Sequence, residues 1–473
     1  MSAVATLRDT YDVAVIGAGP AGLSAATGCA RAGLSTVLFD EQGEPGGQIY
    51  RAITRVPAAR RALLGEDYAH GAGIAEAFRG SGAQYVPGAT VWSVSKEREI
   101  GVSSGGAARL TQARRIILAT GALERPMPIP GWTLPGVMTV GAAQILLKTS
   151  GLVPTGQVVL AGCGPLLYLF AWQMLRAGQA PAAILDTTDP AARSEAMAHL
   201  GAFVFSRYFV KGASLMWAVR RRVRIVRGVT ALSVQGEGRA TRVEFEHAGG
   251  RDSLALDTLL LHQGVVPNVN LANSIGIEHR WDEVQLAFVP VVDAFGTTGV
   301  DGIAIAGDGA GIAGAWAAED RGTLAAIAAA RALNAPNPAA LPDEAGVRQR
   351  LQKNLAARRF VDLMYRPAAA FRQPTGDTIV CRCEEITARQ IRATVAMGCS
   401  GPNQMKAFLR CGMGPCQGRY CGLTVTELMA AERGVSPQEV GHYRLRPPIK
   451  PVTVAELAAL PQTEASVKAV VRG

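Results

Sequence analysis

Two segments of this chain share a pattern that strongly limits its fold: an apolar run, a glycine-rich turn and a second apolar run. In the first segment the turn holds Gly17, Gly19 and Gly22. In a nucleotide-binding βαβ unit the first glycine makes the tight turn, the second lets a pyrophosphate approach the backbone, and the third lets helix and strand pack closely. The pyrophosphate lies over free N–H groups at the helix N-terminus. The pattern predicts an α/β fold with a dinucleotide site, which includes Pro20 and Ala21.

A second apolar run, Ser35–Phe39, ends in two acidic residues, Asp40 and Glu41. Asp40 lies 23 residues after Gly17, which is the approximate spacing at which an acidic residue accepts hydrogen bonds from the ribose of a dinucleotide. A glycine pattern alone is weak, but here the strand, the helix and the acidic residue are all in register. We therefore expect Asp40 and Glu41 to contact ribose hydroxyls.

The second segment repeats this arrangement. It has Gly162 and Gly164 in the turn, Leu167 in place of the third glycine, and Asp186 at the end of the next apolar run, 24 residues after Gly162. The leucine predicts altered packing between helix and strand, and Asp186 would repel a 2′-phosphate, which argues against NADPH. Three alternatives stay open for this site: an adenine nucleotide such as ATP that donates no hydride, a functional NAD(H), or a structural remnant without a ligand.

The stretch from Gln157 to Leu175 carries no charge and could be mistaken for a membrane span. Its glycines and Pro165 interrupt it where a strand should turn into a helix, so we expect a buried strand, turn and helix. The first apolar run of the chain, Val13–Ile16, leads into a glycine turn rather than a cleavage site. We expect a cytoplasmic protein, with a peripheral position at the inner face of the membrane as the alternative.

Three further segments indicate that the first site binds FAD rather than NAD. They are residues 44–48 with Gly47 and Gln48, residues 118–121 with Thr120 and Gly121, and residues 302–309 with Gly307 and Asp308. Together they resemble the two-dinucleotide-domain flavoprotein family, which includes the thioredoxin-reductase-like enzymes, over about Asp12–Leu333. The resemblance implies that Gly307 and Asp308 approach the flavin ribityl and phosphate, and that Gln48 lies near the isoalloxazine.

Redox thiols are not expected at the flavin. Neither Cys29 nor Cys163 has a partner cysteine within a few residues, so we expect no disulfide exchange there, and Cys29 is predicted to be a small apolar filler. His262 follows an apolar strand and is expected to be a buried core histidine. We predict no catalytic residue.

The net charge is +10, and residues 220–227 hold five of the arginines. We expect a solvated helix end that leads into a strand, with contact to a partner protein or a nucleotide phosphate as the alternative. No recognised nucleic-acid-binding module accompanies the charge, which argues against nucleic acid as a partner.

Six of the eight cysteines lie between Cys381 and Cys421. The candidate ligands are Cys381, Cys383, Cys416 and Cys421, in the pattern C-x-C, a gap of 32 residues, and C-x4-C. Four thiolates in two close pairs suit a [2Fe-2S] cluster. Zinc is the alternative, although structural zinc sites use wider pairs than C-x-C. Cys411 is expected to be a spare thiol near the site.

This cysteine-rich module resembles the bacterioferritin-associated-ferredoxin-like [2Fe-2S] domain through residues 412–418. In this chain a flavoprotein part is followed by a cluster module and then by the tail at residues 443–452. This arrangement resembles that of the α subunits of two-component opine dehydrogenases, the octopine and nopaline oxidases. D-hydroxyproline dehydrogenase and the B subunit of hydrogen cyanide synthase are close kin. The resemblance covers nearly the whole chain.

The resemblance implies a heteromeric enzyme that oxidises the C–N bond of an N-substituted amino acid. A flavoprotein β subunit of the amino-acid-oxidase type would oxidise the substrate, and this chain would pass electrons through FAD and [2Fe-2S] to a quinone or another component of the respiratory chain. An FMN could lie at the subunit interface. Two other functions stay open: a self-sufficient NADH-dependent reductase, and an assembly scaffold whose cofactors are structural.

At 473 residues the chain should hold roughly three domains. The expected division, by residue number, is an FAD-binding domain 1–150 and 262–333, a second nucleotide-binding-type domain 151–261, a linker 334–375, a small helical [2Fe-2S] domain 376–435, and a C-terminal tail 436–473.

Overall fold

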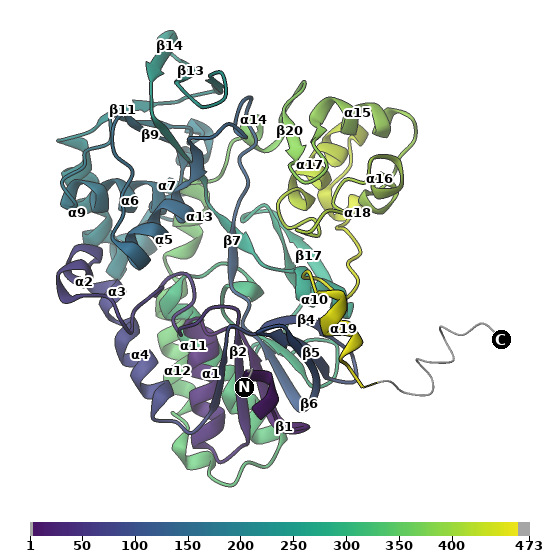
Figure 1. Ribbon diagram of the computed structural model, residues 1–473. Coiled ribbons are helices and arrows are strands. Elements are labelled where there is room, and N and C mark those ends of the chain that lie inside the picture. Colours follow the sequence, from purple (N-terminus) through teal and green to yellow (C-terminus); the bar gives the residue numbers. More distant parts are fainter. Residues whose placement is uncertain (1–2, 462–473) are drawn as a thin grey trace.

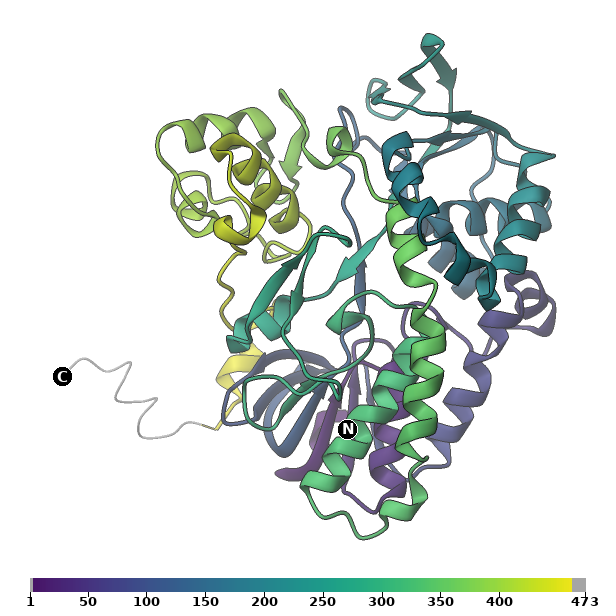
Figure 2. The ribbon, with the colours of Figure 1, turned by 180° about the vertical axis from the view of Figure 1, so that it is seen from behind.

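A computed structural model describes residues 3–461 of the chain. Figures 1 and 2 show a lower body that contains β1 (Thr10–Ile16) and α1 (Pro20–Arg31), an upper lobe made by residues of the middle of the chain, and a helical lobe made by residues near its C-terminal end. Each of the first two is built on its own largely parallel sheet. The predicted α/β architecture with a small C-terminal helical part is confirmed.

The lower body is built on a seven-stranded sheet in the order β3-β2-β1-β6-β5-β4, with β19 beside β6. Its strands are β1 Thr10–Ile16, β2 Thr36–Asp40, β3 Gln84–Pro87, β4 Thr90–Val94, β5 Glu99–Ser104, β6 Ala107–Leu118 and β19 Ile303–Ile305. β1 pairs in parallel with β2 and β6, and β19 pairs in parallel with β6, so these strands end at one edge. Parallel sheets are covered on both faces, and β1 accordingly has four consecutive buried residues at its end.

Helices cover one face of this sheet (Figures 1 and 2). They are α1 Pro20–Arg31, α4 Gly71–Arg79, α11 Ala315–Ala332 and α12 Glu344–Leu355, with the short α2 Ala58–Leu64 and α3 Glu66–Ala69 near the upper lobe. α1 packs against α11 through small residues, and Gly28 lies against Ala326: a Cβ at Gly28 would come within 2.8 Å of the Ala326 Cβ. Small residues let these helix backbones approach closely.

The upper lobe holds a five-stranded sheet in the order β11-β10-β9-β15-β8. Its strands are β8 Val137–Thr139, β9 Val158–Cys163, β10 Ala183–Asp186, β11 Arg224–Arg227 and β15 Thr258–Gln263. The helices beside it are α5 Val140–Ser150, α6 Pro165–Arg176, α7 Pro190–Met197, α8 Leu200–Val204 and α9 Arg207–Arg220. An antiparallel sheet extends from it, with β12 Ala231–Gln235, β13 Arg242–His247 and β14 Gly250–Ala255. The strand, turn and helix predicted from Gln157 onward are confirmed.

Two antiparallel strands connect the lower body with the upper lobe. β7 Ala122–Glu124 leads out of the body and β16 Val265–Pro267 leads back, paired at Leu123 and Val266. After the return the chain forms α10 Asn270–Ile275, the hairpin β17 His279–Asp282 and β18 Ala287–Pro290, and the short η2 Gly307–Ala310.

The segment predicted to be a linker folds into helices that contact both larger parts. α12 packs on α11 of the body, whereas α13 Arg358–Met364 packs on α7 of the upper lobe. Phe360 of α13 stacks on Phe203 with ring centroids 4.3 Å apart. The short α14 Ala369–Arg372 then leads to the helical lobe.

The helical lobe has its own buried core, and Cys381, Cys411 and Cys421 are part of it. Its elements are β20 Ile379–Cys381, β21 Ile386–Thr387, α15 Ala388–Ala396, α16 Pro402–Leu409, α17 Gly422–Arg433 and α18 Pro437–Val440. The tail returns to the lower body, where the Ile449 N–H donates to the Trp92 carbonyl at 2.9 Å and α19 Val454–Ala458 lies beside β6. Within residues 3–461, none of the helices combines the length and the apolar composition that crossing a membrane requires.

Candidate cofactor sites

The first glycine turn has the shape of a pyrophosphate site. A Cβ at Gly17 would lie 2.4 Å from the Ala119 carbonyl oxygen, and one at Gly22 would lie 1.8 Å from the Gly17 carbonyl oxygen. Only glycine fits at either position. Gly19 differs, because nothing lies within 4 Å of its Cβ position and no side chain caps the helix that begins at Pro20. Gly19 is thus the place where a ligand can approach the backbone, as the sequence predicts.

Asp40 lies beside this turn at the end of β2. Its carboxylate accepts hydrogen bonds from the backbone N–H groups of Ala18, at 2.5 Å, and Gln42, at 2.6 Å. Burial raises the pKa of Asp40, and the two backbone donors act in the opposite direction. A carboxylate has about four lone-pair sites, so Asp40 keeps acceptor capacity for ribose hydroxyls. Glu41 instead forms an ion pair with Lys450 of the tail, with 2.6 Å between Oε1 and Nζ.

A second loop closes against the first. Gly46 donates its N–H to the Ala18 carbonyl at 2.8 Å, and a Cβ at Gly47 would lie 2.8 Å from the Gly19 Cα. The next residue, Gln48, accepts a hydrogen bond from Arg51 through its side chain at 2.8 Å. The predicted residues Gly47 and Gln48 therefore lie beside the glycine turn.

Lys148 is a residue that the sequence prediction missed. It is 4% exposed, and its Nζ donates to the Gln48 carbonyl at 3.1 Å and to Gln144 Oε1 at 2.8 Å. Burial, with a smaller effect of Arg51, lowers the pKa of Lys148 to about 7. The available signal was a single charged residue in the otherwise uncharged segment Val140–Ser150.

The remaining predicted residues follow β6 and β19, whose ends are neighbours. Gly307 lies against Ala21, since a Cβ there would come within 2.7 Å of the Ala21 Cβ, and Gly309 lies beside Thr120. Asp308 accepts hydrogen bonds from the N–H groups of Ala313 and Gly314, at 2.8 and 3.0 Å. Gly121 follows Thr120 with a φ of +66°. All of these loops meet at the carboxyl edge of the sheet, where ligands bind in open α/β folds.

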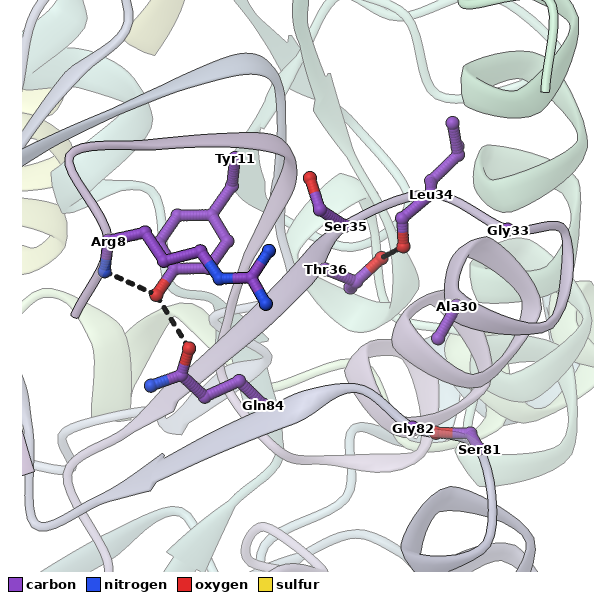
Figure 3. Close-up of a pocket in the computed structure, with 10 residues that line it drawn as sticks. All are labelled: Arg8, Tyr11, Ala30, Gly33, Leu34, Ser35, Thr36, Ser81, Gly82 and Gln84. Atoms are coloured by element: carbon purple, nitrogen blue, oxygen red, sulfur yellow. Dashed lines mark hydrogen bonds between the residues drawn. The ribbon is translucent and has the colours of Figure 1, made fainter. Parts of the chain in front are cut away.

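A surface hollow of about 330 Å³ lies at the opposite edge (Figure 3). Its residues come from the beginnings of the strands: the Tyr11 hydroxyl accepts from the Arg8 N–H at 2.9 Å and donates to Gln84 at 2.6 Å. Tyr11, Thr36 and Gln84 belong to the starts of β1, β2 and β3. This hollow is therefore separate from the predicted dinucleotide site.

The second glycine turn is surrounded differently. Asp186 is 1% exposed and both carboxylate oxygens are engaged. Oδ2 accepts from the Tyr168 hydroxyl at 2.8 Å and from Arg193 at 2.6 Å, and Oδ1 accepts from the Thr188 N–H at 2.9 Å. Leu167, in place of the third glycine, is fully buried. The group that would accept ribose hydroxyls is thus bonded within the protein.

Two buried residues complete the surroundings of this turn. His262 is 2% exposed, and its Nδ1 lies 2.6 Å from Glu124 Oε1, so the prediction of a core histidine is confirmed. A Cβ at Gly164 would lie 2.9 Å from the His262 Nε2. Tyr365, which follows α13, accepts a hydrogen bond from the Cys163 thiol through its carbonyl at 3.4 Å. The segment 334–375, predicted to be a linker, thereby covers Cys163.

Five cysteines converge in the helical lobe. The sulfurs of Cys381, Cys411 and Cys421 lie within 4.8 Å of one another and are buried. Cys383 and Cys416 interact with each other at the surface of the lobe. The structure thus brings together the four predicted ligands in two groups, and it adds Cys411 to the buried group.

The sulfurs suit a metal centre chemically. Hydrogen bonds from Cys411 and Cys421 lower the pKa of Cys381, and the same bonds to Cys381 raise the pKa of Cys411 and Cys421. Cysteine binds metals as the thiolate. The loop is tight, because a Cβ at Gly414 would lie 2.3 Å from the Cys383 Cβ. Donor set and loop therefore fit a thiolate-held cluster. The assignment of Cys381, Cys383, Cys416 and Cys421 as its ligands stays a prediction.

A buried charge cluster joins the helical lobe to the rest of the molecule. Arg125, next to β7, and Arg372 of α14 both contact Glu427 of α17. Arg125 and Glu427 are 4% and 2% exposed, and Arg125 also donates to the Gln285 and Leu286 carbonyls at 2.7 and 2.8 Å. Breaking such a buried pair costs about 3–5 kcal/mol. This cluster holds α17, which begins directly after Cys421, against the connection between the two sheets.

Comparisons with known proteins agree with this geometry. Residues 11–332 match the family model of the pyridine nucleotide-disulphide oxidoreductases, and residues 375–460 match the model of the sarcosine oxidase A3 domain. The chain is 48% identical over 480 residues to the opine oxidase A protein of Rhizobium meliloti, covering 99% of this chain and 91% of that one. It is 30% identical over 463 residues to the hydrogen cyanide synthase protein HcnB of Pseudomonas aeruginosa, covering 93% and 96%.

A solved structure has the same fold. The crystal structure of L-proline dehydrogenase from P. horikoshii superposes with a TM-score of 0.71, covering 95% of this chain and 79% of that chain, at 19% identity. At this identity the similarity concerns the fold alone.

Proposed function

The chain belongs to the pyridine nucleotide-disulphide oxidoreductase family, in the group of the opine oxidase A subunits, and from this premise we propose that it is the electron-transfer subunit of a heteromeric amine dehydrogenase. The predicted kinship with opine oxidase A subunits and with the hydrogen cyanide synthase protein HcnB is confirmed. The chain is an oxidoreductase subunit, and the proposal concerns its cofactors, its partner and its route for electrons.

One observation carries the proposal: the chain combines a dinucleotide site in the lower body with a cluster of thiols in the helical lobe. Gly19 has open space in which a pyrophosphate would fit, and Asp40 beside it would accept from a ribose, as FAD requires. In the helical lobe three buried cysteines lie together, and Cys383 and Cys416 interact beside them. FAD exchanges electrons in pairs or singly and a [2Fe-2S] cluster exchanges them singly, so the two together can split an electron pair. The Arg125–Glu427 pair would keep the two sites at a fixed separation.

The thiols outside the helical lobe support this route. Cys29 is on α1 of the body and Cys163 ends β9 of the upper lobe, and burial raises the pKa of each thiol to about 12. Such thiols are inert, since the thiolate is the reactive form. Electrons would therefore leave the flavin for the cysteine-rich lobe rather than for a thiol pair.

The relatives indicate the substrate class. One is named as an opine oxidase, and the C-terminal match is to a sarcosine oxidase domain. We propose that a partner flavoprotein β subunit of the amino-acid-oxidase type removes a hydride from the carbon beside the nitrogen of an N-substituted amino acid. The nitrogen loses its proton to solvent, so that the substrate becomes an imine, and the two electrons pass through this chain to a quinone or another respiratory component. An FMN at the subunit interface belongs to the same proposal.

The second glycine turn argues against the NADH-dependent alternative. Tyr168 and Arg193 engage Asp186, and the chain near Tyr365 covers Cys163. A dinucleotide would have to displace these groups. We propose that the upper lobe receives no hydride from NADH.

Co-expression with an amino-acid-oxidase-type subunit tests the proposal. The complex should oxidise opines or hydroxyproline with an artificial dye as acceptor, while this chain alone should not. Cys416→Ser should stop reduction of the dye, whereas Cys29→Ser, a matched change at a buried thiol in the body, should not. Full activity of the isolated chain, or rapid bleaching of its flavin by NADH under anaerobic conditions, would contradict the proposal.

A further inference from the structure

Tyr443 of the tail lies directly beneath the cysteine loop and is fully buried. Two glycines of the loop and Gly422, the first residue of α17, rest on its ring. A Cβ would come within 2.6 Å of the ring Cζ at Gly412, 2.7 Å of Cδ2 at Gly418 and 3.1 Å of Cδ2 at Gly422. The ring therefore fits the loop only because these positions lack side chains, and its place relative to the sulfurs is fixed by packing.

The hydroxyl of Tyr443 is buried and makes no hydrogen bond within the part of the chain that the structure describes. Leaving a buried polar group unpaired costs about 1–3 kcal/mol, so such a group commonly serves a ligand or a site. The Cys411 thiol is its neighbour. Cys411 directly precedes Gly412, where a Cβ would lie 3.0 Å from the Tyr443 hydroxyl oxygen.

Cys411 in turn lies against two predicted cluster ligands. Its sulfur is within 4.8 Å of those of Cys381 and Cys421, although it is outside the predicted set of four. A thiol that does not bind iron can donate its S–H to a neighbouring thiolate. Tyr443, Cys411 and the two ligand sulfurs thus form a continuous buried group.

We propose that Tyr443 and Cys411 are hydrogen-bond donors that raise the reduction potential of the [2Fe-2S] cluster, with the phenol acting through the Cys411 thiol on the sulfurs of Cys381 and Cys421. This inference rests on the proposed function. Reduction adds one electron, supplied by the flavin, to the iron–sulfur centre and breaks no bond. Donors to the ligand sulfurs stabilise the added negative charge and so favour the reduced state. Both residues are positioning residues that act through the ligands.

The test compares Tyr443→Phe and Cys411→Ala in the co-expressed complex. Iron and acid-labile sulfide are measured first, and then the fraction of reduced cluster is followed by electron paramagnetic resonance at a series of fixed solution potentials. Both variants should keep wild-type iron. The ratio of reduced to oxidised cluster at a given potential should fall about tenfold in each, the amount that one hydrogen bond to a charged group provides. In the Cys411→Ala background, Tyr443→Phe should lower the ratio of reduced to oxidised cluster only a little further.

Tyr420→Phe is the matched control, because Tyr420 is in the same loop but is 57% exposed. It should leave the ratio unchanged. Wild-type ratios in both Tyr443→Phe and Cys411→Ala would overturn the proposal, as would loss of iron from Cys411→Ala, which would make Cys411 a ligand. If Tyr443→Phe fails to fold, the ratio of reduced to oxidised cluster in Cys411→Ala alone decides the outcome. A wild-type complex without iron would instead contradict the proposed function, so the two failures are distinguishable.

Discussion

The two glycine turns of this molecule have nearly the same sequence pattern but different surroundings. At the first turn Asp40 is held by two backbone N–H groups and Gly19 faces open space. At the second, Asp186 is engaged by the side chains of Tyr168 and Arg193, and a histidine lies against Gly164. The two turns therefore share a local fold and differ in the groups that surround their acidic residues.

The largest expected difference between the turns concerns their second glycines. Gly19→Val should weaken FAD binding at least a hundredfold, about 2.8 kcal/mol, because the side chain would occupy the space where a pyrophosphate approaches. The fold should survive, since nothing in the chain lies within 4 Å of that Cβ position. Flavin titration of the apoprotein and its melting temperature measure the two effects.

Gly164→Ala is the counterpart in the second turn. It should strain the loop, which has a φ of +123°, yet leave the affinity for FAD unchanged. Equal losses of flavin in Gly19→Val and Gly164→Ala would remove the distinction between the turns.

The acidic residues of the two turns should also differ: Asp186 should affect stability, and Asp40 should affect FAD binding. Asp186→Ala should lower the free energy of unfolding by about 1–3 kcal/mol, because Tyr168 and Arg193 lose a buried acceptor. It should not change flavin content. Asp40→Ala should weaken FAD binding about tenfold, or 1.4 kcal/mol. Denaturant unfolding and flavin titration of both variants separate these outcomes, and an Asp186→Ala protein that loses its flavin would contradict them.

A further expected effect depends on pH and concerns Lys148, which reaches from α5 of the upper lobe to Gln48 of the lower body. The unfolded chain binds this proton more tightly than the folded chain, because burial lowers the pKa of Lys148 from its ordinary 10.5 to about 7. The destabilisation by Lys148 is therefore complete below pH 7 and disappears as the pH rises toward 10.5. Relative to Lys148→Met, the wild type should gain about 1.4 kcal/mol of stability per pH unit above pH 7.

Unfolding free energies of the wild type and Lys148→Met between pH 6 and 9 check this slope. Lys96→Met, at an exposed position in a loop of the lower body, serves as the control because it removes a lysine that is not buried. A constant difference between wild type and Lys148→Met across this range would show that the lysine does not titrate there.

Much of the fold followed from local patterns in the sequence. The two strand–turn–helix units were predictable, and so were the tight packing at Gly17 and Gly22 and the position of Asp40 at the end of β2, because these features depend on neighbours close in sequence. The buried core position of His262 was also predicted correctly. The arginine-rich stretch forms the expected helix end and strand, at α9 and β11.

What could not be predicted depends on contacts between distant segments. The partners of Glu427 come from residues 125 and 372, and the ring under the cysteine loop comes from Tyr443. Likewise, Asp186 follows the pattern of a ribose acceptor, and only the fold reveals that Tyr168 and Arg193 engage it. Glu41 has the predicted position beside Asp40, yet it pairs with Lys450. Periodicity and motif spacing contain no information about such pairs.

Metal analysis of the anaerobically purified complex tests the central claim most directly. If this chain carries a flavin and a thiolate-held cluster, iron and acid-labile sulfide should each be present at about two per FAD of this subunit. The cluster should disappear in Cys381→Ser and persist in Cys399→Ser, a cysteine of the same lobe outside the group of three. Zinc in place of iron, with no acid-labile sulfide, would contradict the account.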